Sequence, residues 1–314
     1  MDEKSNRLIS VIVVTAGVKN YIFSCLDSLS KQNYPEIEVI VIDNSRAPVL
    51  GSRILSEYPF VRLYLSPISL SYCESLNVGI GSAKGEFILC LNDDVVLTKE
   101  FIGQAIRGFD ISKRIGMVSG KILRFDGKLI DSTGLYLSIW RTAKERGYDS
   151  LDIGRFDKPG YIFGVTGAVA FYRRKMLEDI KTLGEYFDTD FGFFYEDLDI
   201  AWRANNAGWK GYYIPQAIAY HARGGTARRE RGGVNRKYAR LYLNDGLYFD
   251  LIKNRYLTIV KNESLPGLLI YFPFIIAYSV FSWFFTFLFR PVLSVRLLLR
   301  PIQLRAAFKK RRVR

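Results

Sequence analysis

The amino-acid sequence predicts an α/β fold built on a mostly parallel sheet with flanking helices. Three features of the first 42 residues lead to this prediction. Leu8–Thr15 is a run rich in β-branched residues, apolar residues recur at helical spacing over Tyr21–Leu29, and Ile37–Ile42 is a second apolar run. Strand, helix and strand in such a short stretch form a βαβ unit, whose preferred handedness makes the two strands parallel.

The next segments extend the same parallel arrangement. Val61–Leu65 is predicted to be a short strand and Glu74–Ala83 a helix. Phe87–Leu91 is apolar throughout, between Gly85 and Asn92, as expected of a strand that is buried on both faces. Because the carboxyl ends of parallel strands share one edge, where open α/β sheets bind ligands, that edge is expected to carry Thr15, Asp43, Asp93 and Asp94.

The part of the chain from Phe101 to His221 is predicted to add helices and strands around this core. Periodicity and turn residues indicate helices over Phe101–Phe109, Arg173–Leu183 and Glu196–Gly208, a hairpin between Met117 and Tyr136, an apolar segment over Tyr161–Tyr172 and a strand over Tyr212–Tyr220. Trp140–Lys158 is charged and irregular, so it is expected to be a surface loop. Gly164 and Gly167 mark positions where the backbone approaches a neighbour closely.

The composition is that of a folded protein, with 49% hydrophobic and 24% charged residues. The net charge is +14, and nine of these charges lie after Phe289, where no acid occurs. Cys25, Cys73 and Cys90 lack C-x-x-C spacing, so we expect reduced thiols on a cytosolic face and no disulfide. The N-terminal MDEKSNRL contains no apolar segment of a signal peptide.

The C-terminal part of the chain is predicted to associate with a membrane. Leu265–Phe289 contains no charge and is long enough to cross a bilayer, although Pro266 and Pro273 are expected to break or kink a helix. A single crossing would separate the main body from the basic tail, and both favour the cytoplasmic leaflet. A re-entrant or interfacial hairpin, followed by an amphipathic basic helix over Val292–Phe308, satisfies the charge rule better. The predicted domains are therefore 1–262 and 263–314.

Two acidic motifs adjoin predicted elements, and each has a structural and a chemical interpretation. Asp93 and Asp94 either form a polar turn that ends a strand or bind a cation that offsets their mutual repulsion. Glu196 and Asp197 either interact with a helix dipole or act as proton acceptors. The aromatic run Phe191–Tyr195 would raise their pKa by excluding water, whereas the dipole would lower it.

His221 is the only histidine in the sequence and follows the last predicted strand. Such a histidine is either a hydrogen-bonded structural residue or part of a site. The segment that follows, ARGGTARRERGG, is basic and rich in glycine, so it either closes over an anion or forms a solvated surface or nucleic-acid patch. It contains no aromatic residue for stacking on bases, which argues against nucleic acid.

The ordered motifs resemble those of family 2 glycosyltransferases, especially the rhamnosyltransferase-like branch. They are VIVVT, VIDNS, N-x-G at Asn77, LNDD, FGVTGA, FFYEDLDIAWR and IPQAIAYH, and they extend over about Leu8–Thr226. The resemblance implies a GT-A nucleotide-sugar-binding fold for the domain 1–262. It also implies transfer of a sugar from a nucleoside diphosphate donor, with inversion at the anomeric carbon and with Mg²⁺ or Mn²⁺ as cofactor.

The resemblance also implies roles for individual residues. Asp94 and His221 correspond to metal ligands, and Asp197 to the general base, with Glu196 positioning it. The substrate-binding residues that we expect, including glycine and arginine candidates, are Thr15, Asp43, Asn77, Asp93, Gly167, Arg223, Arg228 and Arg229. The chain departs from the family pattern at Asn92, which replaces the first aspartate of D-x-D, and at Ala16-Gly17-Val18, which replaces a polar Tyr-Asn.

The function that follows is sugar transfer to a lipid-linked saccharide or polysaccharide precursor at the cytoplasmic side of the cell membrane. A deoxyhexose such as rhamnose is the first donor sugar to expect, and mannose or another hexose the next. One alternative is a nucleotidyltransferase of similar fold, although Ala16-Gly17-Val18-Lys19 is a poor phosphate loop. The other is a non-catalytic protein that binds a membrane surface, because the basic tail adjoins an apolar segment and suits lipid headgroups better than nucleic acid.

Overall fold

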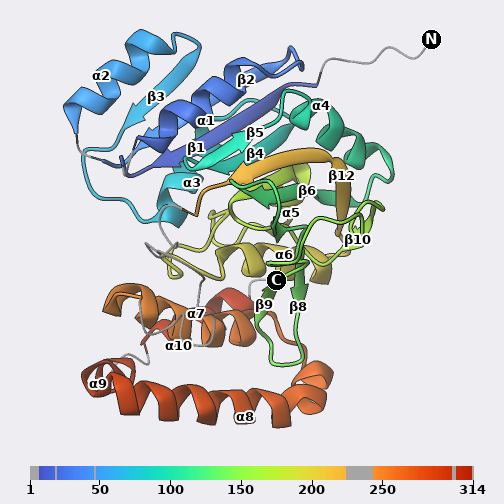
Figure 1. Cartoon of the computed structure of the whole chain (residues 1–314). Coiled ribbons are helices and arrows are strands. Elements are labelled where there is room, and N and C mark those ends of the chain that lie inside the picture. The colour runs from blue at the N-terminus through green and yellow to red at the C-terminus, as the bar shows by residue number, and fades with distance from the viewer. Residues whose placement is uncertain (1–6, 18–19, 46, 224–242, 299–301, 313–314) are drawn as a thin grey trace.

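The computed structural model describes residues 7–17, 20–45, 47–223, 243–298 and 302–312. Its centre is a ten-stranded mixed sheet with helices on both faces (Figure 1). The strands of this sheet, and of a separate hairpin formed by β8 and β9, are β1 (Ile9–Thr15), β2 (Ile37–Asp43), β3 (Val61–Leu65), β4 (Phe87–Asn92), β5 (Val95–Leu97), β6 (Ile115–Arg124), β7 (Ile130–Ser132), β8 (Leu135–Leu137), β9 (Ala143–Glu145), β10 (Gly160–Ile162), β11 (Val169–Arg173) and β12 (Lys210–His221).

Helices surround this sheet and continue beyond it at the C-terminal end. They are α1 (Tyr21–Ser30), α2 (Pro48–Glu57), α3 (Tyr72–Ser82), α4 (Phe101–Ala105) with the 3₁₀ turn η1 (Ile106–Asp110), α5 (Arg174–Ile180), α6 (Glu196–Asn206), α7 (Asp245–Asn262), α8 (Leu265–Phe289), α9 (Pro291–Leu298) and α10 (Ile302–Arg312). Ser71 caps α3, since its side chain accepts from Glu74 N–H while Glu74 accepts from Ser71 N–H.

The parallel half of the sheet has the order β4-β1-β2-β3, which confirms the predicted βαβ unit. Its strands are apolar on both faces because both faces are covered. Val11 and Val13 pack in one cluster with residues of α1, whereas Ile12 packs on the other side with residues of α3. Gly79 allows α3 to lie this close, because a Cβ at that position would be 2.4 Å from Ile12 Cγ2.

The second half of the sheet joins the first through an antiparallel strand. β11 lies between β4 and β6 and is antiparallel to both, and β12 runs parallel to β6. The end of β12 also pairs with the short strand β5, which places His221 opposite Val95. This topology brings the end of β12 to the same edge of the sheet as the end of β4.

Several predicted elements differ from the structure. The predicted surface loop 140–158 contains β9, and Arg141 within it is buried. Helices α2 and α7 were not predicted. The predicted hairpin within Leu265–Phe289 is wrong, since α8 is one continuous helix that includes Pro273. The predicted helix over Val292–Phe308 is instead the two helices α9 and α10 in the described residues.

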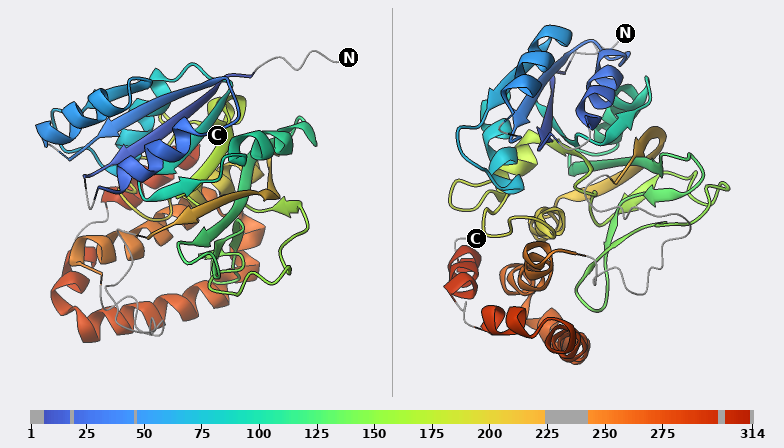
Figure 2. Two further views of the ribbon diagram at one scale, coloured as in Figure 1. Left: turned by 45° about the horizontal axis from the view of Figure 1, so that its top comes forward. Right: turned by 60° about the vertical axis from the view of Figure 1, so that its left-hand side comes forward.

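The C-terminal helices form a layer beside the sheet and its flanking helices (Figure 1). α7 lies next to α6, and α8 lies on the far side of α7 (Figures 1 and 2). α7 is tied to the sheet domain by buried polar contacts, because Lys261 Nζ contacts Asp188 at 2.5 Å and Asp199 at 3.0 Å. Asn254 also donates to the backbone oxygens of Phe191 and Phe193, just before α6.

Candidate active site

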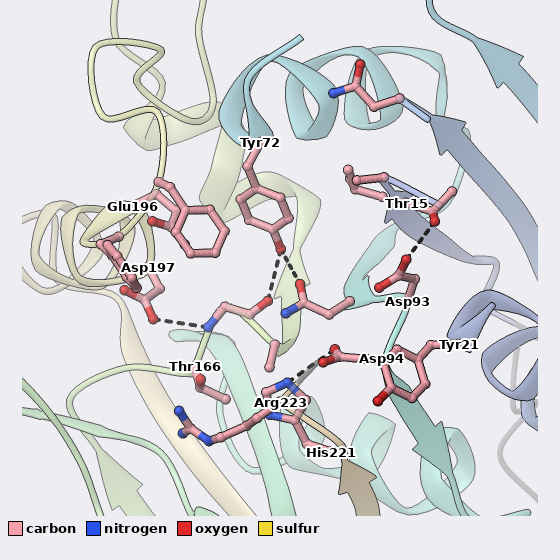
Figure 3. A pocket seen from close by; sticks show the side chains of 18 of the residues that line it. Thr15, Tyr21, Tyr72, Asp93, Asp94, Thr166, Glu196, Asp197, His221 and Arg223 are labelled. Carbon is pink, nitrogen blue, oxygen red and sulfur yellow. Dashed lines mark hydrogen bonds and ion pairs between the residues drawn. The ribbon is translucent and has the colours of Figure 1, made fainter. Parts of the chain in front are cut away.

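A cavity of about 410 Å³ opens at the carboxyl ends of the central strands. Its lining comes from the ends of β1 and β4, the segment before β11, the start of α6 and the end of β12 (Figure 3). The predicted site residues that line it are Thr15, Asp93, Asp94, Gly167, Glu196, Asp197, His221 and Arg223. The sheet topology thus brings motifs from the whole length of the domain into one cavity.

Asp94 and His221 face each other in this cavity. His221 Nε2 lies 3.2 Å from Asp94 Oδ1, and both side chains are only 8% exposed. The pairing of β5 with β12 explains this proximity, because Ala222 N–H donates to the backbone oxygen of Asp94 at 3.0 Å. Two residues that are remote in the sequence therefore form one buried pair.

Asp131 orients the imidazole of His221, a role that the sequence did not reveal. The Nδ1 atom of His221 lies 2.8 Å from Asp131 Oδ2, and Arg223 Nε donates to Asp131 Oδ1. Burial lowers the pKa of His221, but the hydrogen bonds to Asp131 and Asp94 outweigh it and raise that pKa to about 9. Because Nδ1 donates to the carboxylate, Nε2 is the nitrogen that faces Asp94 and the cavity.

The Asp94–His221 pair fits one divalent cation. Oxygen and nitrogen ligands about 2.1 Å from a common ion lie roughly 3 Å apart, which matches the separation of Asp94 Oδ1 and His221 Nε2. Within the described residues, no group of three or more His, Cys, Asp or Glu side chains is placed to hold a metal. A cation here would therefore take its remaining ligands from water and from the oxygens of a bound molecule, as Mg²⁺ does with phosphates.

Asp93 points away from its neighbour Asp94 and toward β1. Thr15 Oγ1 donates to Asp93 Oδ2 at 2.6 Å, and Thr15 Oγ1 also accepts from Gly17 N–H at 3.0 Å. Burial raises the pKa of Asp93 to about 6, and the charge of Asp94 adds to the rise. The two adjacent aspartates thus have different partners, one at β1 and the other at β12.

Asn92, where the chain departs from D-x-D, is held by a tyrosine. Tyr72 Oη contacts Asn92 Oδ1 at 2.8 Å and the backbone oxygen of Gly167 at 3.2 Å. A hydroxyl that donates to this amide oxygen joins the start of α3 to the end of β4. The geometry gives Asn92 a positioning contact, and Tyr72 lines the cavity beside it.

Glu196 and Asp197 open α6 on the opposite side of the cavity from Asp93 and Asp94 (Figure 3). Asp197 Oδ2 accepts from Gly167 N–H at 3.1 Å, and Oδ1 accepts from Leu198 N–H at 2.7 Å. Burial raises the pKa of Asp197 in spite of these hydrogen bonds. It also raises that of Glu196 to about 8, with the charge of Asp197 as the next cause. Desolvation therefore outweighs the backbone hydrogen bonds that these two carboxylates accept.

Glu145 on β9 is a third carboxylate near α6, and the sequence did not point to it. Ser132 Oγ donates to one of its oxygens, and Thr166 Oγ1 donates to the other at 2.9 Å. Burial raises the pKa of Glu145 to about 7, and the charge of Asp197 contributes. A short strand in a charged, irregular segment has no pattern that marks such a residue, so only the folded hairpin places it in the cavity.

The cavity has a large excess of acidic groups. Its lining, in the part of the chain that the structure describes, contains the carboxylates Asp93, Asp94, Glu145, Glu196 and Asp197. The basic side chains among the same lining residues are His221 and Arg223. An anionic ligand such as a diphosphate would be repelled by such a lining unless a cation lay between them.

Some predicted site residues lie elsewhere. Asp43 is buried and accepts from Ser45 N–H at 2.8 Å, and the next residue, Asn44, lines the cavity in its place. Asn77 is not part of the lining. Its side chain donates to Phe187 O at 2.7 Å and accepts from the backbone N–H of Phe187 at 2.9 Å, so it anchors the segment before α6. Arg228 and Arg229 lie outside the described residues.

Proteins of related sequence are glycosyltransferases. The chain is 24% identical over 220 residues to the poly-beta-1,6-N-acetyl-D-glucosamine synthase of Staphylococcus epidermidis, which covers 68% of this chain and 49% of that protein. It is 24% identical over 222 residues to the amylovoran biosynthesis glycosyltransferase AmsB of Erwinia amylovora, with 68% and 69% coverage. The chain thus spans about half the length of the first of these relatives.

Solved structures of similar fold contain nucleotide sugars. TarS 1–349 of S. aureus, in complex with UDP-GlcNAc, is 19% identical and has a TM-score of 0.54 over 96% of this chain and 79% of its own. The mannosyltransferase PcManGT from Pyrobaculum calidifontis, in complex with GDP-Man and Mn²⁺, is 17% identical and has a TM-score of 0.52, with 97% and 87% coverage. These similarities confirm the GT-A-like fold.

The family itself is shown by a match that covers most of the chain. The sequence model described as "Glycosyltransferase like family 2" matches residues 6–242, from before β1 to beyond β12. All of the lining residues of the cavity fall within this range. The chain therefore belongs to the family 2 glycosyltransferases, which are inverting enzymes, as its ordered motifs predicted.

Proposed function

We propose that this enzyme transfers a sugar from a nucleoside diphosphate donor to a saccharide acceptor, with inversion and with a divalent metal. The observation that carries the proposal is that one cavity contains a buried Asp94–His221 pair and, across from it, the carboxylates that open α6. The first group suits a metal-bound diphosphate, and the second suits an acceptor hydroxyl. Inversion in one step requires a base on the acceptor side and no covalent intermediate.

Asp197 is the base in this proposal. Its pKa is raised by burial, so it takes a proton from the acceptor hydroxyl more readily than a solvated carboxylate does. The N–H groups of Gly167 and Leu198 hold its two oxygens. Glu196 supports it from the adjacent position, and a Cβ on Gly167 would lie only 3.1 Å from Glu196 Oε1, so glycine leaves the room that the acid pair needs.

The donor side of the proposal uses the remaining lining residues. Mg²⁺ or Mn²⁺, held by Asp94 and His221, would neutralise charge on the leaving diphosphate. Arg223 supplies a further positive charge in the cavity, and Arg228 and Arg229 are proposed to assist from the segment outside the described residues. Thr15 and Asp93 are proposed to bind the nucleoside of the donor, and Asp43 lies behind them.

The acceptor is proposed to be a lipid-linked saccharide or a polysaccharide precursor. Relatives named for polymer synthesis, poly-beta-1,6-N-acetyl-D-glucosamine synthase and the amylovoran glycosyltransferase, support a polysaccharide product. Rhamnose remains our first donor sugar, then mannose or another hexose. The apolar helix α8 supports a location at the membrane, and we propose that the sheet domain faces the cytoplasm.

A panel of nucleotide sugars tests the donor and the metal together. The full-length chain in detergent should release nucleoside diphosphate from one donor class, and EDTA should abolish the release until Mg²⁺ or Mn²⁺ is restored. Release that is unaffected by EDTA would overturn the metal proposal. Release of pyrophosphate from a nucleoside triphosphate, with no turnover of any nucleotide sugar, would instead indicate a nucleotidyltransferase.

A substitution at α6 tests the base. Asp197→Asn keeps the shape of the side chain but removes its ability to accept the proton, so kcat should fall by roughly 10²–10⁴-fold. The exposed Asp179→Asn on α5 is the matched control and should retain full turnover. Full activity in Asp197→Asn would assign the proton transfer to another group, with Glu145 and Glu196 the next to test.

A further inference from the structure

The outer face of α8 is apolar along its whole length. The side chains that are more than half exposed are Leu265, Leu269, Ile270, Phe272, Val280, Phe281, Phe284, Phe287, Leu288 and Phe289. No polar side chain of α8 is exposed. Soluble monomers rarely expose so many large apolar side chains on one helix face, and such a face marks a contact with another apolar phase or partner.

The inner face of α8 carries the polar side chains of the helix. Thr286 Oγ1 lies 2.9 Å from Tyr248 Oη, Trp283 Nε1 donates to Tyr256 Oη at 2.9 Å, and Arg255 donates to Ser279 Oγ at 3.1 Å. A helix at a water surface shows the opposite pattern, with polar residues outside. The pattern of α8 therefore suits a helix that rests on protein with one side and faces hydrocarbon with the other.

These same contacts fix the direction of α8. Thr286, near its end, contacts Tyr248 near the start of α7, whereas Ser279, in the second half of α8, contacts Arg255 farther along α7. The two helices therefore run antiparallel and side by side, as Figures 1 and 2 also show. The polar contacts between the two helices extend from Ile275 to Thr286 of α8.

Both ends of α8 are attached to the same protein body. Immediately before its start, Glu263 forms an ion pair with Arg141 at 2.5 Å. At its end, Arg290 donates to the backbone oxygen of Leu243 at 2.6 Å and pairs with Asp245 at the start of α7. A crossing helix has its two ends on opposite sides of about 30 Å of hydrocarbon. In this protein that would carry α7, with its buried Lys261 and the Asp188 that Lys261 contacts, into the bilayer.

We infer that α8 does not span the membrane but lies in its plane, with the outer apolar face in one leaflet of an anionic bilayer. α9 extends this surface, because Val292, Val295 and Leu298 are also exposed. The inference goes beyond the proposed sugar transfer and rests only on the proposed contact with lipid. A helix of this kind penetrates roughly 5–10 Å and leaves both its ends at the headgroups.

Charge favours a bilayer over a second copy of the chain as the occupant. The sequence contains no acid after Glu263, and Arg296 on α9 and Arg305 and Lys309 on α10 are exposed. Two copies that met through this surface would find no acid on α8 or α9 to pair with these basic residues. Anionic headgroups would instead be attracted by each of them, by about 1 kcal/mol per residue near the surface.

Flotation with vesicles tests the lipid contact. The full-length chain should float with phosphatidylcholine–phosphatidylglycerol vesicles and less with phosphatidylcholine alone. Phe281→Glu/Phe284→Glu/Phe287→Glu should reduce flotation at least tenfold with an unchanged melting temperature. The matched control, Leu151→Glu/Ile153→Glu/Leu183→Glu, changes three exposed apolar residues of the sheet domain and should float normally. Undiminished flotation of the α8 variant, or a lipid-free dimer that only this variant dissociates, would overturn the inference.

Cysteine labelling tests the in-plane orientation. Pro266→Cys and Pro291→Cys place thiols at exposed sites near the two ends of α8, while Cys25, Cys73 and Cys90 are buried and give little background. In sealed membrane vesicles, an impermeant maleimide should label both positions from the same side. One position labelled from each side would show a spanning helix. Nucleoside diphosphate release by the same variants reports separately on the proposed chemistry.

Discussion

Asp131 holds the Nδ1 atom of His221, so Nε2 is the nitrogen that faces the cavity. The Asp131 side chain is 2% exposed and also accepts from Arg223, so its position is fixed from two directions. A histidine that binds a metal through Nε2 commonly donates Nδ1–H to a carboxylate, which orients the ring and makes it a better ligand. Asp131 is therefore a positioning residue for the proposed metal site.

Asp131→Asn should weaken binding of Mn²⁺ to the purified chain by roughly 10–100-fold. The asparagine amide can donate to Nδ1 and so select the tautomer in which Nε2 is protonated and unable to bind metal. Electron paramagnetic resonance titration with Mn²⁺ alone measures the affinity without any turnover. The exposed Asp179→Asn serves as control. An unchanged affinity in Asp131→Asn would contradict the positioning role.

Glu145 should make the stability of the protein depend on pH. Its folded-state pKa is raised from 4.5 to about 7, so the native state binds the proton more tightly than the unfolded chain does. This contribution to stability is fully present below about pH 4.5 and is lost as the pH rises through 7. A glutamine at this position has no titrating carboxyl group, so its contribution to stability does not change over this pH range.

The free energy of unfolding of Glu145→Gln, relative to the natural chain, should therefore increase between pH 5 and pH 8. We expect an increase of roughly 1–3 kcal/mol, because one pKa unit corresponds to about 1.4 kcal/mol and the carboxylate is only partly buried. Thermal denaturation in EDTA at several pH values measures it. Glu100→Gln, which changes an exposed glutamate, is the control, and its free energy of unfolding should differ from that of the natural chain by the same amount at every pH. If the free energies of unfolding of Glu145→Gln and of the natural chain changed in parallel with pH, the prediction would be contradicted.

Helix α10 shows that the basic tail has two parts with different roles. Lys310 is buried against Asp188, Asp190 and Glu185, in the segment that leads to α6. Arg311 donates to the backbone oxygens of Val260 and Glu263 on α7. Lys309, by contrast, is exposed. The sequence pattern favours lipid headgroups as the partners of the basic tail, but part of that charge instead joins α10 to the sheet domain.

Lys310→Met should destabilise the protein by about 2–3 kcal/mol, because it leaves buried carboxylates with fewer partners. The loss is limited because Lys261 still contacts Asp188. Lys309→Met removes the same charge from the adjacent exposed position, so it should leave the melting temperature unchanged and lower only the affinity for anionic vesicles. Equal melting temperatures for the two variants would show that the Lys310 contacts contribute nothing.

The parts of the fold that the sequence predicted are those with a local pattern. Continuous apolar runs predicted β1, β2 and β4, and ordered motifs pointed to Asp94, Asp197 and His221, which line one cavity. α7 escaped prediction because buried polar residues such as Asn254 and Lys261 interrupt its apolar period. Asp131, Glu145 and Tyr72 were missed for a different reason. Glu145 and Tyr72 reach the cavity, and Asp131 reaches His221, through packing of segments that are distant in the chain, and no spacing in the sequence records that packing.

On the scale of the whole molecule, α7 joins the sheet domain to the apolar surface. Its inner side contacts the residues before α6, and its outer side is covered by α8. Tyr248, Arg255 and Lys261 are buried between these layers. The predicted boundary at residue 262 would therefore fall inside a packed unit and not in a linker, since domain boundaries lie where few contacts cross.

A chain that ends at residue 262 should consequently be less stable than the whole protein, even in detergent. It would expose Tyr248 and leave Arg255 without Ser279 and the backbone of Ile275. We expect the melting temperature to fall by roughly 5 °C or more, since loss of several buried contacts costs a few kcal/mol. The full-length chain with glutamates at Phe281, Phe284 and Phe287 is the control, because it loses the apolar surface but keeps the covering of α7. A truncated chain as stable as this control would show that residues 1–262 fold on their own, with the C-terminal helices merely attached to them.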